Sequence, residues 1–337
     1  MLLVLAVDFK NGSNCTVLSD NKGGVMREVF LPTLEQVSVL VIFIIIGYAL
    51  KITGKVKDGK VLSSLLLWVF LPAVVFKVFS ENFTVSKLGE AKDYLIAGCL
   101  VFGVVFGISY LISFRYSERM KRNVLWYSFV VTNMSYVGFV LVDRLLNEYV
   151  LYYMVFIIPF QIFIYTAAIS MFKPEKEKFS LKGLISPVNV AMISGMAVGL
   201  IFDFAGIKMP SVITTIVSSA SGCMSPAAML LTGITLANVP IKTVFCSLEA
   251  YAFTFLRLIV FPAVIGGITY LLYLWLGFSA GIVKITLVYL ALPFGLNSVV
   301  FAEAYGGDGS LGAQIGFLSH LFCIVTLPLL FLLISLI

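Results

Sequence analysis

The sequence contains little charge. Only 12% of its 337 residues are Asp, Glu, Lys or Arg, whereas 60% are hydrophobic. A typical soluble domain has about 25% charged residues, and a soluble fold of this length lacks the interior to bury so much apolar surface. The composition therefore excludes the water-soluble classes and indicates a chain that crosses a lipid bilayer many times.

Residues that carry catalytic or metal chemistry are scarce as well. The chain has one histidine, His320, and five cysteines that stand singly, so no metal-ligand spacing occurs. No Ser/His/Asp, P-loop or dinucleotide pattern is present. No pair of aspartates lies at mid-membrane, which weakens the case for a sodium–proton antiporter. We therefore expect neither an enzyme, nor a metal site, nor a bound cofactor.

The apolar residues form runs long enough to span a bilayer as helices, after a polar tail at residues 1–30. The expected fold class is an all-α polytopic membrane protein. We predict ten spans, near 31–50, 61–80, 94–114, 124–142, 149–172, 187–204, 211–236, 244–274, 283–303 and 310–336.

The net charge of +6 is explained by topology. Thirteen Lys and Arg residues lie in the loops after the first, third, fifth and seventh spans, against five in the alternate loops. Because basic loops stay in the cytoplasm, both termini are expected outside the plasma (inner) membrane. The basic residues therefore give no reason to expect a nucleic-acid partner.

The two halves of the chain share weak matches in the same order. Two five-helix repeats are predicted, 31–172 and 187–337, joined by a short cytoplasmic loop at 173–186. An odd number of helices forces the second repeat to insert upside down, which is typical of secondary transporters. The paired residues are Gly47 and Gly54 with Gly199 and Gly206, Pro72 with Pro226, Gly107 with Gly267, Asn133 with Asn297, and Pro159 with Pro328.

The fourth and ninth spans, which the repeat relates, look broken at mid-depth. Pro293 removes a backbone donor and Gly295 frees the backbone in the ninth, and polar side chains cluster in the fourth. Half-helices that meet inside a membrane expose N–H ends suited to a carboxylate, and carbonyls suited to a cation. The alternative is a proline kink whose asparagines bond neighbouring helices. The predicted crossover site consists of Asn133, Ser135, Gly138, Pro293, Gly295, Asn297 and Ser298.

These two stretches carry a resemblance to a known family. Thr132–Val142 and Leu292–Asp308 resemble the fourth- and ninth-helix motifs of the auxin efflux carrier family, and Leu71-Pro-Ala and Leu327-Pro-Leu fit as well. The likeness runs from about residue 31 to the end, and the short central loop resembles bacterial members. Val140 stands where many members have a proline.

The resemblance implies a fold similar to that of bile-acid symporters, with crossing broken helices. Spans 1, 2, 6 and 7 would form a scaffold domain, through which the protein would form a homodimer. Spans 3–5 and 8–10 would form a transport domain that moves as an elevator. The implied substrate is a small organic anion such as malate, malonate or an auxin-like acid.

Ionisable and polar groups inside the membrane are further candidates for substrate binding or coupling. Lys77 either snorkels to the interface or meets a substrate carboxylate, and Glu303 is either a solvated helix end or part of a proton relay. His320 is either a neutral core residue or a group that titrates near physiological pH. Gln161 is a candidate polar liner of the fifth span.

Two rival functions remain open at the level of sequence. One is a sodium-coupled symporter of the bile-acid carrier type, so that H⁺ and Na⁺ are both candidate coupling ions. The other is a membrane receptor or sensor that kept a transporter fold, although no added signalling domain is evident. The expected partners are thus the organic anion and the lipid bilayer.

Overall fold

The computed structural model describes residues 31–172, 185–238, 241–277, 279–295, 297–298, 310–335 and 337. The predicted tail at 1–30, most of the predicted loop at 173–186, and Glu303 lie outside these residues. Across the described ranges the regular structure is helical, and the extended pairing consists of one isolated β-bridge, between Thr132 and Phe294.

The helices of the first half follow the predicted apolar segments. They are α2 (Leu31–Ile52), α3 (Lys60–Leu65), η2 (Leu66–Phe70), α4 (Leu71–Asn82), η3 (Val85–Lys87), α5 (Leu88–Ser113), α6 (Arg119–Val130), η4 (Met134–Gly138), α7 (Phe139–Leu145), η5 (Asn147–Tyr149), α8 (Val150–Phe156), α9 (Ile158–Phe163), η6 (Ile164–Ala168) and α10 (Ile169–Phe172).

The described part of the second half is helical as well. Its helices are α11 (Pro187–Ala205), α12 (Ser211–Gly222), α13 (Met224–Leu236), α14 (Ile241–Phe245), α15 (Leu248–Phe255), η8 (Leu256–Val260), η9 (Pro262–Gly266), α16 (Gly267–Leu276), α17 (Ala280–Ala291) and α19 (Ser310–Ile334).

Among the described residues, six helices are long and apolar enough to cross a membrane: Lys60–Asn82, Val85–Ser113, Pro187–Ala205, Ser211–Leu236, Leu248–Trp275 and Ser310–Ile334. A further candidate is the pair Asn147–Phe156 and Ile158–Ala168, which is bent by 43°. The sequence did not predict this bend as a break. It lies at Ile157, two residues before Pro159, where the proline ring disturbs the preceding turn.

The predicted eighth span also needs correction at its start. Residues 241–245 form the separate short helix α14, and the long helix begins only at Leu248. Ser247 is extended, and its hydroxyl accepts a hydrogen bond from the N–H of Ala250, which caps the new helix.

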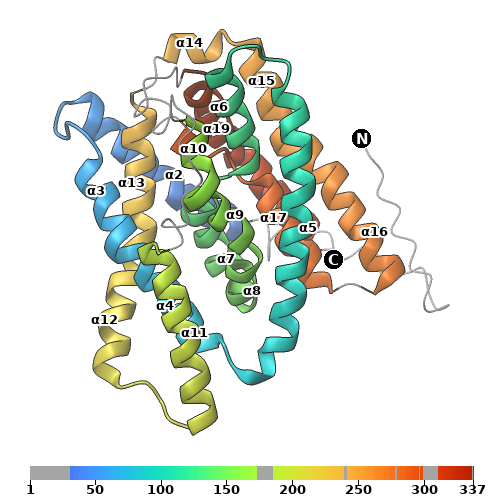
Figure 1. Cartoon of the computed structure of the whole chain (residues 1–337). Helices are drawn as coiled ribbons and strands as arrows, with labels where there is room; N and C mark the ends of the chain where they lie inside the picture. Colours follow the sequence, from blue (N-terminus) through green and yellow to red (C-terminus); the bar gives the residue numbers. More distant parts are fainter. Residues whose placement is uncertain are drawn as a thin grey trace.

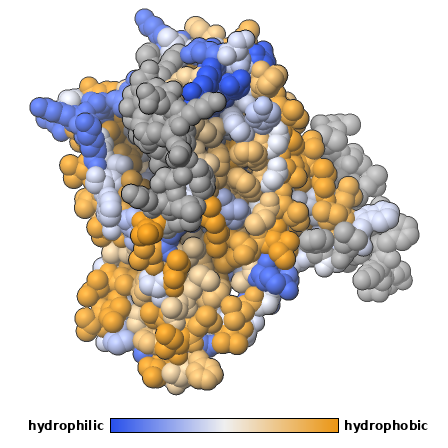
Figure 2. Space-filling view, viewed as in Figure 1, coloured by the Kyte–Doolittle hydropathy of each residue, from blue (hydrophilic) through white to orange (hydrophobic). Residues whose placement is uncertain are grey.

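The basic loops gather at one end of the molecule. In Figure 1 the α2–α3 and α5–α6 connections and α14 lie at the top, whereas the α4–α5 and α11–α12 connections lie at the bottom. Figure 2 shows hydrophilic residues concentrated at that upper end and an apolar surface over much of the face below. This arrangement is the one expected of a protein whose sides lie in lipid.

Two helix pairs are packed backbone to backbone through glycine. Helix α2 packs on α13, where a Cβ at Gly47 would overlap the carbonyl of Leu230 and a Cβ at Gly233 would overlap that of Ile44. Helix α11 packs on α4, where a Cβ at Gly199 would lie 2.7 Å from the carbonyl oxygen of Phe79. Small residues permit such close approach and are the usual contact residues of membrane helices.

Aromatic rings pack between several of the remaining helices. Phe129 at the end of α6 lies 5.0 Å from Phe294 and 5.3 Å from Phe261, measured between ring centroids. The rings of Phe160 on α9 and Tyr289 on α17 are 4.2 Å apart. These contacts surround the places where the fourth and ninth segments are interrupted.

Candidate functional site

The fourth segment is broken between α6 and η4. After Val130 the backbone is extended at Val131 (φ −108°, ψ 108°), and Asn133 stands directly before the next helical turn. The break forms although Val140 replaces the proline common in similar sequences. The next segment begins with the π-helix η4, in which the N–H groups of Val137 and Gly138 both bond the carbonyl of Asn133.

The ninth segment is broken after α17, as the sequence predicts. Leu292 is extended (φ −66°, ψ 147°), because the ring of Pro293 disfavours a helical residue before it. Helical geometry returns at Asn297 and Ser298, and the residues that follow, 299–309, lie outside the described part of the chain.

The two breaks meet each other. Thr132 and Phe294 form an antiparallel bridge in which the N–H of Asn133 donates to Pro293 O (2.9 Å) and that of Gly295 donates to Val131 O (3.2 Å). Each interrupted helix thus supplies backbone partners to the other, which is what an extended segment away from water requires. A Cβ on Gly295 would lie 2.9 Å from the carbonyl oxygen of Val131, so glycine keeps this approach open.

Arg257 bonds the C-terminal ends of both α6 and α17, the helices that precede the two breaks. Its guanidinium is fully buried and donates to Phe129 O on α6 (3.2 Å) and to Tyr289 O on α17 (3.0 Å). The last carbonyls of a helix carry partial negative charge and lack partners within the helix. One cation therefore compensates the carbonyl ends of both half-helices.

Two tyrosine hydroxyls bond further carbonyls beside the breaks. Tyr289 donates to Val130 O (2.5 Å), and Tyr153 on α8 donates to Met134 O (2.8 Å). Gly138 makes room for the second bond, because a Cβ there would overlap the hydroxyl of Tyr153 and lie 2.6 Å from Leu292 Cδ1. Gly138 thus makes room for a side chain of α8 and for one from the extended residue after α17.

His320 on α19 lies beside the break in the fourth segment. His320 Nε2 lies 3.0 Å from Asn133 Nδ2, and both side chains are buried. The neighbouring Ser319 hydroxyl accepts the N–H of Phe294 (3.1 Å). Asn133 therefore bonds a neighbouring helix, as expected from the alternative in which the asparagines bond other helices at a proline kink. The helix at Asn133 is nevertheless interrupted by extended backbone and not only kinked.

The other predicted crossover residues differ from one another in burial and in hydrogen bonding. Ser135 is half-buried in the first turn after the break, and Pro293 is buried at the bridge. Ser298 is fully buried and donates to Gly295 O (3.2 Å), whereas Asn297 is exposed. The two asparagines that the repeat pairs therefore differ in their surroundings.

Two predicted residues lie apart from the bridge. Lys77 is half-buried on α4, and its charge acts on Asp143 at the end of α7. Gln161 is buried on α9, next to Phe160, whose ring packs on Tyr289. Lys77 thus lies within electrostatic range of Asp143, and Gln161 lies on a helix that borders the crossover.

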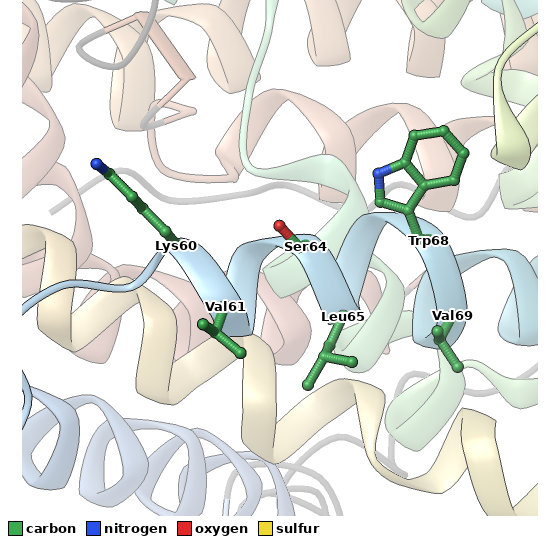
Figure 3. Close-up of a pocket in the computed structure, with 6 residues that line it drawn as sticks. All are labelled: Lys60, Val61, Ser64, Leu65, Trp68 and Val69. Carbon is green, nitrogen blue, oxygen red and sulfur yellow. The ribbon is translucent and has the colours of Figure 1, made fainter.

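A shallow depression of about 370 Å³ lies elsewhere, on the face of one helix. Figure 3 shows Lys60, Ser64 and Trp68 on one side of this helix and Val61, Leu65 and Val69 on the other. The Trp68 side chain is 70% exposed. These residues line an open and mostly apolar surface, which lacks the convergent polar groups of a binding site.

Sequence reasoning notes Arg257 as an ionisable group within the eighth span without assigning it a role, and it misses Tyr289. The signal for Arg257 was present, because an arginine within an apolar span is costly unless it has a partner. Tyr289 gave no comparable signal, since tyrosine is common in the chain, which has 15 of them. Each donates to a carbonyl of α6 more than 100 residues away, Arg257 to Phe129 O and Tyr289 to Val130 O, and periodicity does not indicate such contacts.

Electrostatically the crossover is asymmetric. Arg257 and Tyr289 occupy carbonyls near the ends of α6 and α17, whereas beyond the breaks helical geometry resumes after Asn133 and at Asn297. Helix N-termini carry partial positive charge and lack acceptors within the helix. Such an arrangement can hold a carboxylate without a countercharge in contact with it.

Comparison with protein families gives a match over nearly the whole chain. The model for the family described as "Membrane transport protein" matches residues 32–181 and residues 176–331. A comparison with curated proteins finds no match. Together with the apolar spans, this result identifies a multi-pass membrane protein of a transporter family, and the chain therefore belongs to the membrane transport protein family, that of the auxin efflux carriers.

Proposed function

We propose that the protein is a secondary active or facilitative transporter of a small organic anion, most simply a mono- or dicarboxylate. The observation that carries this proposal is the meeting of two interrupted helices whose carbonyl ends are occupied by Arg257 and Tyr289. The groups that we propose contact the ligand are the N-terminal ends of the two helical segments after the breaks, together with the amide and hydroxyl side chains beside them. These groups donate hydrogen bonds and favour an anion.

We further propose that the chain consists of two inverted five-helix repeats. Gly47 and Gly199, which the repeat relates, both form glycine-mediated helix contacts. Gly54 and Gly206, a second related pair, have φ of 72° and 65° after the ends of α2 and α11. Matching backbone features at matching positions support the repeat, and inverted repeats support alternating access.

The proposed mechanism is an elevator. The scaffold would comprise α2, α3–α4, α11 and α12–α13, where glycine contacts hold α2 to α13 and α4 to α11. The transport domain would comprise α5–α10 and α15–α19, which include the crossover. We expect homodimerisation through the scaffold and, from the basic loops, both termini on the outer side of the plasma (inner) membrane.

The proposal predicts that Asn133→Ala combined with Asn297→Ala reduces transport by more than tenfold. The loss follows from removing amide groups beside both helix starts. Uptake of labelled malate, malonate and an auxin-like acid into proteoliposomes measures it. Asn147→Ala is the matched control, because Asn147 is exposed and its amide bonds only the nearby Asp143 carbonyl.

Undiminished uptake by the double variant would refute the site. Repeating the wild-type assay with sodium replaced by potassium separates this proposal from a bile-acid-type symporter, whose uptake would stop. Specific binding of an acid without any uptake would instead favour the receptor alternative.

A further inference from the structure

The hydrogen bonds of His320 fix where its proton lies. The ring Nδ1 is 2.7 Å from the carbonyl oxygen of Gly316, and a carbonyl can only accept. Nδ1 therefore carries the hydrogen, and Nε2 has a free lone pair. The partner of Nε2 is Asn133 Nδ2 at 3.0 Å, so the asparagine NH₂ donates to the histidine.

A proton on Nε2 is incompatible with this bond. The ring would then donate at both nitrogens, and the asparagine would have to present its Oδ1 instead of its NH₂. The amide must rotate by half a turn about its last bond. The NH₂ group, which was held by the histidine, then points away from His320.

The charged and titratable groups on the elements that pack against α19 are engaged elsewhere or lie at the ends of their helices. Arg257 of η8 and Tyr289 of α17 bond carbonyls, Glu249 of α15 accepts from the hydroxyl of Tyr116, and Cys323 of α19 contacts Ala291 O. The others are Lys284 of α17, Tyr251 of α15, Arg119, Lys121, Arg122 and Tyr127 of α6, Glu35, Tyr48 and Lys51 of α2, and Lys242 of α14.

Among the described residues, therefore, no carboxylate is hydrogen-bonded to His320. A protonated imidazole here would be a buried cation without a paired anion, which is costly. An anion that entered the crossover would supply the missing negative charge. The two binding events would then favour each other.

Resting on the proposed function, we propose that His320 takes up and keeps the coupling proton, and that Asn133 responds by turning its amide toward the substrate site. The proton comes from water and binds Nε2, the amide of Asn133 turns, and its NH₂ becomes available to a carboxylate. When the carboxylate leaves, the proton returns to water and the amide turns back. Proton and organic anion therefore travel in the same direction.

The first test observes the tautomer directly. His320 is the only histidine of the chain. The nitrogen spectrum of ¹⁵N-histidine-labelled protein, purified without a histidine tag, therefore contains one imidazole. We expect a neutral ring protonated at Nδ1. A neutral ring protonated at Nε2 would overturn the proposal.

The same samples test the amide turn without any ligand. With ¹⁵N-asparagine labelling, the side-chain resonance that Asn133→Ala removes is assigned to Asn133. Acidification is expected to shift it in the wild type and not in His320→Gln, which retains an acceptor but takes up no proton. If acidification changed the Asn133 resonance equally in the wild type and in His320→Gln, the proposed turn of the amide would be overturned.

The second test measures coupling. The affinity for malonate, followed by thermal shift, is expected to rise about tenfold more between pH 8 and pH 5 in the wild type than in His320→Gln. The acid's own titration is the same for both proteins and cancels in this ratio. Ser319→Ala is the matched control, because it removes the neighbouring contact to Phe294 and leaves His320 intact. It should lower the affinity while keeping the pH dependence.

The outcomes separate the two proposals. Equal pH dependence in the wild type and His320→Gln would overturn proton coupling and leave the proposed function standing. If the wild type neither bound nor transported malonate or any other organic acid, the proposed function would fail. In that case the ¹⁵N spectra of His320 and Asn133 would still show whether protonation of His320 turns the Asn133 amide.

Discussion

Replacing Arg257 with methionine is expected to reduce transport at least a hundredfold. The substitution keeps most of the apolar stem but leaves Phe129 O and Tyr289 O without their buried donor. Each unsatisfied buried carbonyl costs about 1–3 kcal/mol, and here both lie beside the crossover. Proteoliposome uptake and the melting temperature of the purified protein should be measured together.

Two further variants show whether charge or geometry matters at this position. Arg257→Lys keeps the positive charge but has one compact ammonium in place of a planar fork, so it should restore little of the activity. Tyr289→Phe removes only the bond to Val130 O and should cost about 1 kcal/mol of stability. Normal uptake by Arg257→Met would show that the carbonyl ends need no compensation.

Gly233→Ala is expected to have the second largest effect. Its new methyl group would overlap the carbonyl of Ile44 and lie 2.7 Å from the N–H nitrogen of Tyr48, and both are backbone atoms of α2. Because a backbone cannot rotate away as a side chain can, α2 and α13 must separate. Overpacking of this kind costs about 1–3 kcal/mol, and a lower melting temperature should report it.

The matched control for this prediction is Gly103→Ala on α5. A Cβ there meets nothing within 4 Å, so the same substitution should leave stability unchanged or slightly improve it. The reciprocal variant Gly47→Ala, which would overlap the carbonyl of Leu230, should behave like Gly233→Ala. If all three variants had the same melting temperature, close glycine packing would not hold α2 against α13.

Much of the fold could be predicted because its causes are local. Apolar runs fix the spans, and Pro293 fixes the break in the ninth segment by excluding a helical Leu292. The break at Val131 has no such local cause. It depends on partners from the other half of the chain, Pro293 and Gly295, and in the sequence only the cluster of polar side chains and the weak repeat pointed to it.

The chemistry of the site was harder to predict because it depends on contacts between distant segments. Asn133 was selected from the sequence as a polar residue in an apolar run, but its partner, His320, lies 187 positions away. The bend at Ile157 was missed for the opposite reason. Pro159 was noticed only as a repeat marker, although its local effect on the preceding turn was predictable.

The bridge between Thr132 and Phe294 has a consequence for how the protein can vary. Its two hydrogen bonds use only main-chain atoms, Asn133 N with Pro293 O and Gly295 N with Val131 O. Side chains at Thr132 and Phe294 can therefore change without loss of this attachment. The crossing is a frame built from peptide groups, so side chains at these two positions can be substituted while the two broken helices remain attached to each other.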